Sequence, residues 1–418
     1  MGQSEAAYWV GVDWGHEEHV VCVLDAQGTP VLRFRVVHCP EGLQELVRRL
    51  REYEPVEGIA VESTRSVLID ALLQANFAVY PINPKLSSKW RKAWSVSGAK
   101  DDGRDALVLA HALIHQRQWL APLKPDSESA RELALLCEDE ARFIGMQTCM
   151  VQQLKDTLRQ YYPAALGWFK DWTSQSAWDF VLSFPTPESI ATASKKKVYG
   201  FLRSHRIGLS AKRREMVEAR GSATEWPSDR AATTAKSLLA VSLAKQLRAL
   251  APTLKEYRRR IEEQFEAHED KEVFESLPGA ARKLAPRLAC ALGTDRTRFD
   301  SARSVQQLSG TAPVTSQSGK RKEVRMRRAC QKDFRCALHL FALQTLQRSR
   351  WSRAYYDLAR ARGQSHALAL RNLANKWLKI LYRMWQNRET YDEQRYIRQL
   401  VKKNSPVAYQ LGLLKTRG

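Results

Sequence analysis

Four acidic residues in the first quarter of the chain have the positions expected of metal ligands. Asp13 and Glu62 each end a short apolar run that reads as a strand. Asp102 and Asp105 are three residues apart, so a helix that begins at Asp102 places both on one face. Carboxylate oxygens suit Mg²⁺ or Mn²⁺ better than zinc, and like charges gathered together repel without a cation. The acids therefore predict a divalent-metal site able to cleave phosphodiesters.

Each of these acids also has a simpler interpretation. Taken singly, an acid is more often a surface residue or a helix cap than a ligand, and Asp102 is well placed to cap its helix. Asp101, directly before Asp102, competes with it for the same role. The order of the set is more specific than any member: a strand ending in Asp, a hairpin, a strand ending in Glu, and a helix with Asp-x-x-Asp.

A second group of residues suggests a nucleophile. Residues 310–319 are rich in Ser, Thr, Gly and Pro and predict a loop, in which Ser318 precedes Gly319 and Ser316 is a competing serine. A serine hydroxyl needs a base or a metal to attack phosphate, and this loop contains no His or Asp. The cationic residues predicted to hold phosphates are Lys320, Arg321, Lys322, Arg325, Arg327, Arg328 and Arg335. The alternative is a basic DNA-contacting surface whose serines only form turns.

Positive charge is concentrated toward the C-terminal end of the chain. The 418 residues include 67 Lys and Arg against 45 Asp and Glu, a formal net charge of +22. Residues 301–418 alone contain 25 Lys and Arg and 6 Asp and Glu, so nearly all of the excess lies there. Because Lys and Arg displace the counterions condensed on phosphates, this distribution predicts a nucleic-acid partner. A solvated basic surface and a membrane-surface patch are the alternatives.

Elements that can position the acids occur in the first part of the chain. Apolar runs at 8–12, 20–24, 31–37, 58–61 and 77–81 predict strands, and the Gly-containing segment 25–28 predicts a hairpin turn. Helical spacing occurs at 43–50, 66–75 and 105–116. This alternation predicts an α/β domain over residues 8–125.

The rest of the chain has mostly helical patterns. Two long stretches, 128–162 and 231–268, predict an antiparallel hairpin or coiled coil, with Pro252 interrupting the second. Residues 163–228 predict a helical insertion, 277–293 two short helices around a Gly turn, and 332–391 further helices. We therefore predict a helical coiled-coil and insertion region over 126–268 and a mainly α-helical C-terminal domain over 269–418.

Two smaller features also point toward nucleic acid. Residues 277–279, Leu-Pro-Gly, are similar to a helix-hairpin-helix turn whose backbone amides bind phosphate, although Ala281 replaces the usual second glycine. Aromatic residues between 351 and 391 interleave with Arg and Lys, which is typical of base-stacking surfaces. The simpler interpretations are helix packing for the turn and a hydrophobic core for the aromatic residues.

Other features exclude several classes of protein. No apolar run approaches the roughly 20 residues that cross a bilayer, and residues 1–15 lack the pattern of a secretory signal. The seven cysteines are scattered and form no CxxC pair, which argues against a zinc site or a disulfide framework. We expect no membrane partner and a cytoplasmic location.

Together these segments resemble a known family. Gly11-Val-Asp13 with its hairpin, Val61-Glu62-Ser-Thr, and the segments 80–84 and 100–106 are similar to the RuvC-like, DEDD-type domain of certain bacterial insertion-sequence recombinases. These are the recombinases described as bridge-RNA-guided. The block 308–342, with Ser318-Gly319 and Arg335, resembles their C-terminal domain. The resemblance covers about residues 8–395 in the same order.

The resemblance carries several further expectations. It implies an RNase H/RuvC-like fold for the first domain, with Asp13, Glu62, Asp102 and Asp105 as catalytic metal ligands. It implies a catalytic serine, best aligned at Ser318, that forms a covalent phosphoserine link to DNA during strand exchange. It also implies a guide (bridge) RNA as a partner, and a homo-oligomer, dimer or tetramer, in which the metal site and the serine act together across subunits.

Three other functions remain open at this point. A RuvC-like metal-dependent DNA nuclease or resolvase would use the carboxylates alone. A sugar-kinase-like or actin-like ATPase also opens with Gly-x-Asp-x-Gly, but its second Gly-rich phosphate loop is not found in this sequence. A non-catalytic nucleic-acid-binding protein would have the same acids as helix caps.

Overall fold

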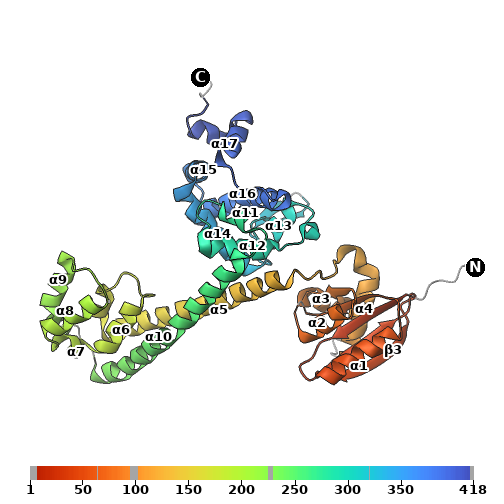
Figure 1. The fold of residues 1–418 in the computed structure, drawn as a ribbon, viewed down its shortest axis with the longest axis horizontal. Coiled ribbons are helices and arrows are strands. Elements are labelled where there is room, and N and C mark those ends of the chain that lie inside the picture. The colour runs from red at the N-terminus through yellow and green to blue at the C-terminus, as the bar shows by residue number, and fades with distance from the viewer. Residues whose placement is uncertain (1–6, 64, 95–101, 225–228, 320, 415–418) are drawn as a thin grey trace, which may run out of the picture. The chain divides into compact units, whose positions relative to one another are not determined.

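The chain divides into two compact units, Met1–Pro125 and Asp126–Gly418. The computed structural model describes residues 7–63, 65–94, 102–224, 229–319 and 321–414. Figure 1 draws the first unit in red and orange and the second in yellow to blue. A mixed α/β region followed by a mostly helical one is confirmed. The finer division of the second unit at residue 268 stays a prediction.

A five-stranded sheet forms the centre of the first unit. Its strands are β1 (Tyr8–Asp13), β2 (Glu18–Leu24), β3 (Pro30–Val37), β4 (Val56–Val61) and β5 (Val79–Pro81). Their order is β3-β2-β1-β4-β5, with the first three strands antiparallel and β1, β4 and β5 parallel. Because β1 and β4 are parallel neighbours, their carboxyl ends meet at one edge of the sheet.

Helices cover both faces of this sheet. They are α1 (Pro40–Arg51), α2 (Val67–Gln74), α3 (Pro84–Trp94), α4 (Asp102–Gln116) and the 3-10 turn η1 (Arg117–Trp119). Val10 and Val12 of β1 pack with leucines of α1 and α2, whereas Ala106 and Ala110 of α4 pack with β2 on the other face. Side chains alternate along a strand, so Asp13 follows Gly11 toward the α4 face.

A close backbone contact joins α4 to β1. A Cβ atom added at Gly11 would lie 2.0 Å from the backbone oxygen of Ala106 and 2.6 Å from the amide nitrogen of Ala110. Only glycine leaves room for a helix backbone this close to a strand. The contact fixes the first turn of α4, and with it Asp102 and Asp105, beside the end of β1.

The second unit is built on two long helices. Helix α5 (Glu128–Tyr161) and helix α10 (Arg230–Glu266) pack against each other as an antiparallel hairpin, as the sequence predicts. Pro252 does not interrupt α10, which corrects the predicted break. Leu247 and Leu254 are buried on either side of it, and packing of this kind outweighs the lost hydrogen bond of a single proline.

The insertion between the two long helices forms a small lobe with its own core. Its elements are η2 (Pro163–Gly167), α6 (Gln175–Ser183), α7 (Pro187–Ala191), α8 (Lys195–Ser204), α9 (Ala211–Glu218) and η3 (Ala219–Thr224). Trp168, Trp178, Phe180 and Phe184 are buried there with α5 residues between Val151 and Tyr161. The predicted helical insertion is confirmed.

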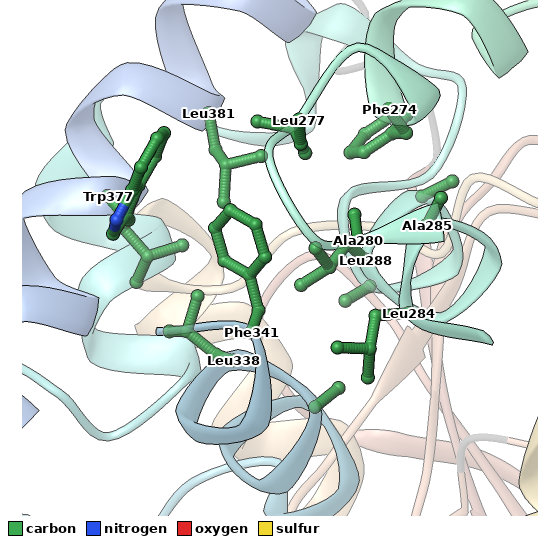
Figure 2. Close-up of a cluster of buried hydrophobic side chains, with 14 of the residues drawn as sticks. Phe274, Leu277, Ala280, Leu284, Ala285, Leu288, Leu338, Phe341, Trp377 and Leu381 are labelled. Atoms are coloured by element: carbon green, nitrogen blue, oxygen red, sulfur yellow. The ribbon is translucent and has the colours of Figure 1, made fainter. Parts of the chain in front are cut away.

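The C-terminal part of the second unit is mainly helical. It contains α11 (Lys271–Glu275), α12 (Ala281–Leu292), η4 (Arg296–Arg298), α13 (Ala302–Leu308), α14 (Lys332–Arg348), α15 (Arg350–Ala361), α16 (His366–Asn387), α17 (Glu393–Lys402) and α18 (Pro406–Gln410). Only one helix, α12, lies within 277–293, and its partner α11 precedes the Gly turn. Figure 2 shows Phe341 and Trp377 among the apolar side chains of α11, α12 and α14.

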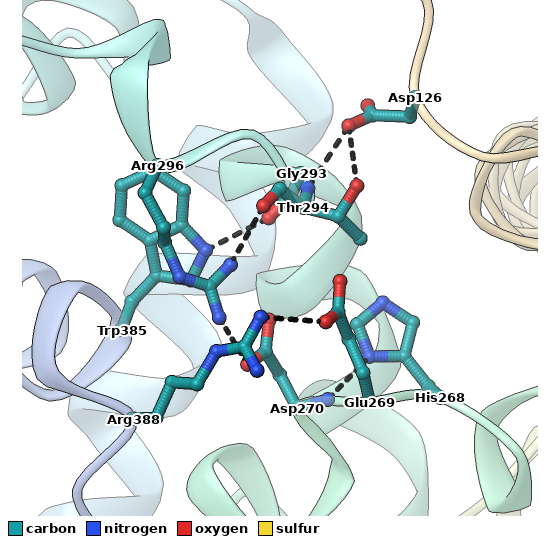
Figure 3. A network of polar contacts seen from close by, with 9 residues as sticks. All are labelled: Asp126, His268, Glu269, Asp270, Gly293, Thr294, Arg296, Trp385 and Arg388. Atoms are coloured by element: carbon teal, nitrogen blue, oxygen red, sulfur yellow. Dashed lines mark hydrogen bonds and ion pairs between the residues drawn. The ribbon is translucent and has the colours of Figure 1, made fainter.

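A polar network connects the ends of these helices. Asp126, the first residue of the unit, accepts hydrogen bonds from the amide (2.9 Å) and hydroxyl (3.0 Å) of Thr294 (Figure 3). Arg296 pairs with the buried Asp270 and lies over the Trp385 ring at 4.8 Å. The start of α5 is thereby tied to the segment that follows α12.

No helix in the described part of the chain is long and apolar enough to span a membrane.

We expect Gly11→Ala to destabilise the first unit by about 3 kcal/mol, because the new methyl group would overlap the α4 backbone. Gly145→Ala is the matched control, since Gly145 lies in α5 with open space around it. That change is expected to stabilise its helix by about 0.5–1 kcal/mol. Urea unfolding followed by circular dichroism measures both. Equal stability of the Gly11→Ala and wild-type chains would contradict the inferred contact.

Candidate active site

The four predicted acids lie around one corner of the α/β unit. Asp13 is the last residue of β1 and Glu62 directly follows β4. Asp102 begins α4 and is exposed, whereas Asp105, one turn later, is only 6% exposed. Asp101, the competing residue, lies outside the described residues. The structure therefore brings together residues that are up to 92 positions apart in the sequence.

The electrostatics of Asp13 show that the four acids influence one another. Burial is the largest cause that raises the pKa of Asp13 to about 6, followed by the charges of Asp105, Asp102 and Glu62 in that order. Arg91 acts in the opposite direction. A carboxyl whose pKa responds to three other acids lies within Coulombic reach of all of them.

Helix α3 holds two of the acids in place, and sequence reasoning missed it. Ser87, 2% exposed, donates a hydrogen bond of 2.6 Å from its Oγ to Oε1 of Glu62. Arg91, one turn later on the same face, forms an ion pair of 2.5 Å with Asp105. The signal that could have found this helix is Pro84 at its first position, preceded by Asn83, whose side chain accepts from the Lys85 amide.

Hydrogen bonds of His19 also stabilise the turn that follows Asp13. The amide of Gly15 donates to Nδ1 of His19 at 3.4 Å, and Nε2 of His19 lies 2.8 Å from Nδ1 of His38. His19 is fully buried. Burial, together with His38, lowers the pKa of His19 to about 4, so the ring is neutral at pH 7. The neutral His19 ring, hydrogen-bonded to both Gly15 and His38, fixes the chain direction after Asp13.

The four acids fit a divalent cation by their chemistry. All are carboxylates, which hard cations such as Mg²⁺ and Mn²⁺ prefer. Among the described residues, no three acidic, His or Cys side chains are close enough together to hold an ion as they stand. Asp105 pairs with Arg91 and Glu62 with Ser87 instead. Repulsion among the acids, visible in the raised pKa of Asp13, is what a bound cation would remove.

The predicted loop with the candidate serines is in fact a β-hairpin. Strand β6 (Val314–Ser318) pairs antiparallel with β7 (Arg321–Arg325), and every β6 residue is exposed. Ser318 lies opposite Arg321, and Ser316 lies opposite Glu323. Directly opposite residues share a face of a hairpin, and alternate residues do as well. Both serines therefore lie on one face, each beside a charge of different sign.

The predicted phosphate-binding residues divide by exposure. Arg321, Lys322, Arg325 and Arg328 are exposed, although Arg325 also pairs with Glu323 at 2.6 Å. Arg327 is half-buried, and its Nε is buried without a hydrogen-bond partner in the described structure. Lys320 lies outside the described residues. Of the exposed members, Arg321, Lys322 and Arg328 have no ion-pair partner within the described residues and can meet a phosphate on the hairpin surface.

Arg335 has a different environment from the other cationic residues. From α14 it donates to the carbonyl of Arg327 (2.7 Å) and approaches that of Ser309 (3.4 Å), at the two ends of the hairpin, and it also contacts Sγ of Cys330. Gly310 has φ +70°, and a Cβ there would lie 2.4 Å from the Arg335 guanidinium. Its geometry favours a role in holding the base of the hairpin over the predicted contact with nucleic acid.

The two smaller predicted features have separate outcomes. The turn before α12 has positive φ at Gly279 (+84°) and also at Ala281 (+43°), so alanine adopts the conformation expected of the second glycine. Phosphate binding by this turn stays a prediction.

Trp351, Trp377 and Trp385 are buried in the helical core, so the prediction that these tryptophans stack on bases is wrong.

Comparisons with known proteins find matches to transposases over most of the chain. Residues 10–163 match the family described as "Transposase", and residues 271–357 match the "Transposase IS116/IS110/IS902 family". The mini-circle putative transposase for IS117 of Streptomyces coelicolor is 30% identical over 410 residues, covering 94% of this chain and 98% of the relative. The chain belongs to the IS116/IS110/IS902 family of transposases.

Two further relatives also match over nearly the full length of both chains. The insertion element IS116 uncharacterized 44.8 kDa protein of Streptomyces clavuligerus is 26% identical, covering 94% of this transposase and 98% of the relative. The insertion element IS900 uncharacterized 42 kDa protein of Mycobacterium paratuberculosis is 26% identical, covering 92% and 96%. The first family match includes all four acids, and the second includes both serines and Arg335. The predicted family is thereby confirmed.

We expect Asp13→Asn to raise the melting temperature of the metal-free transposase by about 2–4 °C, equivalent to roughly 1 kcal/mol. The pKa of Asp13 is raised in the folded chain, so its charged form at pH 7 opposes folding and a neutral amide removes that cost. The exposed Asp70→Asn is the control and is expected to change little. The gain should shrink below pH 6, where Asp13 is already protonated. A loss of stability in Asp13→Asn at pH 7 would refute the inferred repulsion.

We expect Arg335→Ala to speed hydrogen exchange of the β6 and β7 amides by about 10-fold, since hydrogen bonds from a charged donor contribute roughly 1.5–3 kcal/mol. Arg328→Ala, which removes an exposed arginine beside the hairpin, is expected to leave exchange unchanged. Mass spectrometry of the exchanged peptides gives the comparison. Equal rates in the two variants would show that Arg335 does not hold the hairpin.

Proposed function

We propose that this transposase is a metal-dependent serine recombinase. Asp13, Glu62, Asp102 and Asp105 would bind Mg²⁺ or Mn²⁺, and Ser318 would attack DNA phosphodiesters to give a covalent phosphoserine intermediate before strand exchange. The observation that carries the proposal is the coupling of four acids at one corner of the sheet, visible in the pKa of Asp13. Family membership supports DNA as the substrate.

The sheet topology supports an RNase H/RuvC-like assignment of the first unit. Three antiparallel strands followed by two parallel strands, in the order β3-β2-β1-β4-β5, are typical of that fold. In it, acids at the ends of neighbouring strands and on a covering helix share one site. Asp13, Glu62 and the α4 pair occupy those places.

The chain's own residues would prepare the acids for the metal. A bound divalent cation supplies charge neutralisation at the phosphate oxygens and lowers the pKa of an attacking hydroxyl. Ser87 orients one oxygen of Glu62, and Arg91 occupies Asp105. Arg91 is 31% exposed, so its guanidinium is able to leave Asp105 and meet a DNA phosphate instead.

The hairpin geometry favours Ser318 over Ser316 as the nucleophile. In the proposed step the serine hydroxyl loses its proton, a bond forms between Oγ and phosphorus, the bridging phosphorus–oxygen bond breaks, and the leaving oxygen takes up a proton to become a free hydroxyl. Negative charge gathers around the attacked phosphate. Ser318 lies opposite Arg321, which stabilises that charge, whereas Ser316 lies opposite Glu323, which opposes it.

Three wider features belong to the same proposal. A structured guide RNA would bind the basic surface of the C-terminal region, where most of the net positive charge lies. A homo-oligomer, with the α5–α10 pair as a coiled coil, would let the acids of one copy act with the serine of another. Because the substrate is bacterial element DNA, the transposase would act in the cytoplasm.

A plain RuvC-like nuclease is the second proposal. The specific observation in its favour is that all four acids lie in the first unit, whereas both serines lie in the second. Such an enzyme would cleave DNA with no role for the hairpin serines. A non-catalytic nucleic-acid-binding protein is a weaker alternative, because acids used only as caps need not be coupled.

A search for a covalent protein–DNA adduct tests the proposal. The transposase with Mg²⁺, its RNA and DNA carrying the element ends is expected to form an adduct that resists denaturation. Ser318→Ala and Asp102→Ala are each expected to abolish it. Thr315→Ala is the matched control, because Thr315 is a hydroxyl residue on the opposite face of the same strand.

The other outcomes separate the alternatives. An adduct that survives in Ser318→Ala but is lost in Ser316→Ala would make Ser316 the nucleophile. Cleavage without any adduct, lost only in the acid variants, would establish the nuclease. Activity that survives in Asp13→Ala and Asp102→Ala would remove the metal site from the mechanism.

A further inference from the structure

The insertion lobe has a strongly basic surface outside both family matches. The matches end at residue 163 and resume at 271, so helices α8 and α9 belong to neither. From Lys195 to Arg214 the chain contains eight Lys and Arg and no Asp or Glu. This density is independent of the basic C-terminal region and needs its own explanation.

The structure shows which of these cations are free. Lys195 pairs with Glu218, Lys197 lies over the Phe184 ring at 5.6 Å, and Arg213 donates to the carbonyl of Gly208 at 2.8 Å. The other five are exposed, and none has an ion-pair partner within the described residues: Lys196, Arg203, Arg206, Lys212 and Arg214. Cations that hold the lobe together are thus distinct from cations that face solvent.

The free cations lie on the side of the lobe away from its core. On α8, Val198 and Leu202 are buried, while Lys196 and Arg203 are seven residues apart and so share the opposite face. Seven residues of helix span roughly 10 Å. Gly200 lies between them with open space where a side chain would be. The face therefore presents two cations flanking a bare backbone, which lets a polyanion approach closely.

The start of α8 adds to the positive potential. Three lysines occupy its first turn, where the helix dipole already disfavours cations. Arg206, just after α8, is held with φ +53°, and Lys212 and Arg214 begin α9. An anionic partner would relieve this repulsion between like charges.

We propose that the exposed cations of α8 and α9 form a docking surface for the phosphate backbone of duplex DNA, separate from the candidate active site. Duplex DNA has one charge per 3.4 Å on each strand, so the roughly 10 Å between Lys196 and Arg203 matches about three nucleotide steps. The proposal rests on DNA being the substrate of this transposase and not on the metal or serine chemistry. Binding by this surface would be independent of the DNA sequence.

Binding of a labelled random-sequence DNA duplex to the full-length transposase in EDTA tests the surface. The test variants are Lys196→Ala/Arg203→Ala and Lys212→Ala/Arg214→Ala. Each is expected to weaken binding by about 3–10-fold at moderate salt and to lower the slope of log affinity against log salt by about 2. The control is Lys245→Ala/Lys255→Ala, which removes two exposed lysines of α10 without ion-pair partners in the described structure.

The outcomes are distinguishable from failure of the active-site proposal, because EDTA prevents the chemistry in every sample. Thermal melting should be unchanged in the test variants, since all four side chains are exposed. Equal affinity of the test variants and the wild type, or an equal loss in the α10 control, would overturn the proposal. A loss confined to a labelled RNA hairpin, with duplex DNA binding intact, would also overturn it and assign the surface to RNA.

Discussion

The approach of helix α4 to strand β1 at Gly11 is the contact on which the proposed chemistry depends. A helix backbone within van der Waals range of a strand is possible only where the strand has no side chain. The contact brings the first turn of α4 to the end of β1, and Asp102 and Asp105 come with it. The exposed amides of that first turn favour acidic side chains, so the helix end itself stabilises the pair. The absence of a side chain at Gly11 thus determines where Asp102 and Asp105 lie.

Placing these acids near one another lowers the stability of the unit, and neighbouring side chains reduce this effect. Burial and the charges of three other carboxylates oppose ionisation of Asp13, as its raised pKa shows. Arg91 forms an ion pair with Asp105 and Ser87 donates a hydrogen bond to Glu62, so α3 provides partners for two of the acids. The neutral His19, hydrogen-bonded to His38, stabilises the neighbouring turn. Repulsion retained in this way is typical of sites that exchange some stability for function.

The sequence predicted the parts of this arrangement that depend on local pattern. Asp13 and Glu62 were recognisable because each ends an apolar strand, and strand ends of parallel neighbours meet. Helix α3 was missed because its role depends on Ser87 and Arg91 meeting acids far away in the sequence. The β6–β7 hairpin was predicted as a loop, because its serines lie in a segment rich in Gly and Pro, and only pairing with the basic β7 reveals the strand. The predicted break at Pro252 was wrong for a similar reason, because side-chain packing along α10 outweighs the tendency of proline to end a helix.

Both halves of the proposed active site are held by contacts within their own unit. The acids depend on α3 and α4, and the serine hairpin depends on Arg335, whose guanidinium joins the carbonyls of Ser309 and Arg327. A two-stranded hairpin with all of β6 exposed is only marginally stable alone, so its anchoring at the base matters more than its own ladder. Ser318 therefore sits at the far end of a short, anchored arm beside Arg321. Under the proposed mechanism, such an arm would bring the serine to a phosphate that is bound elsewhere.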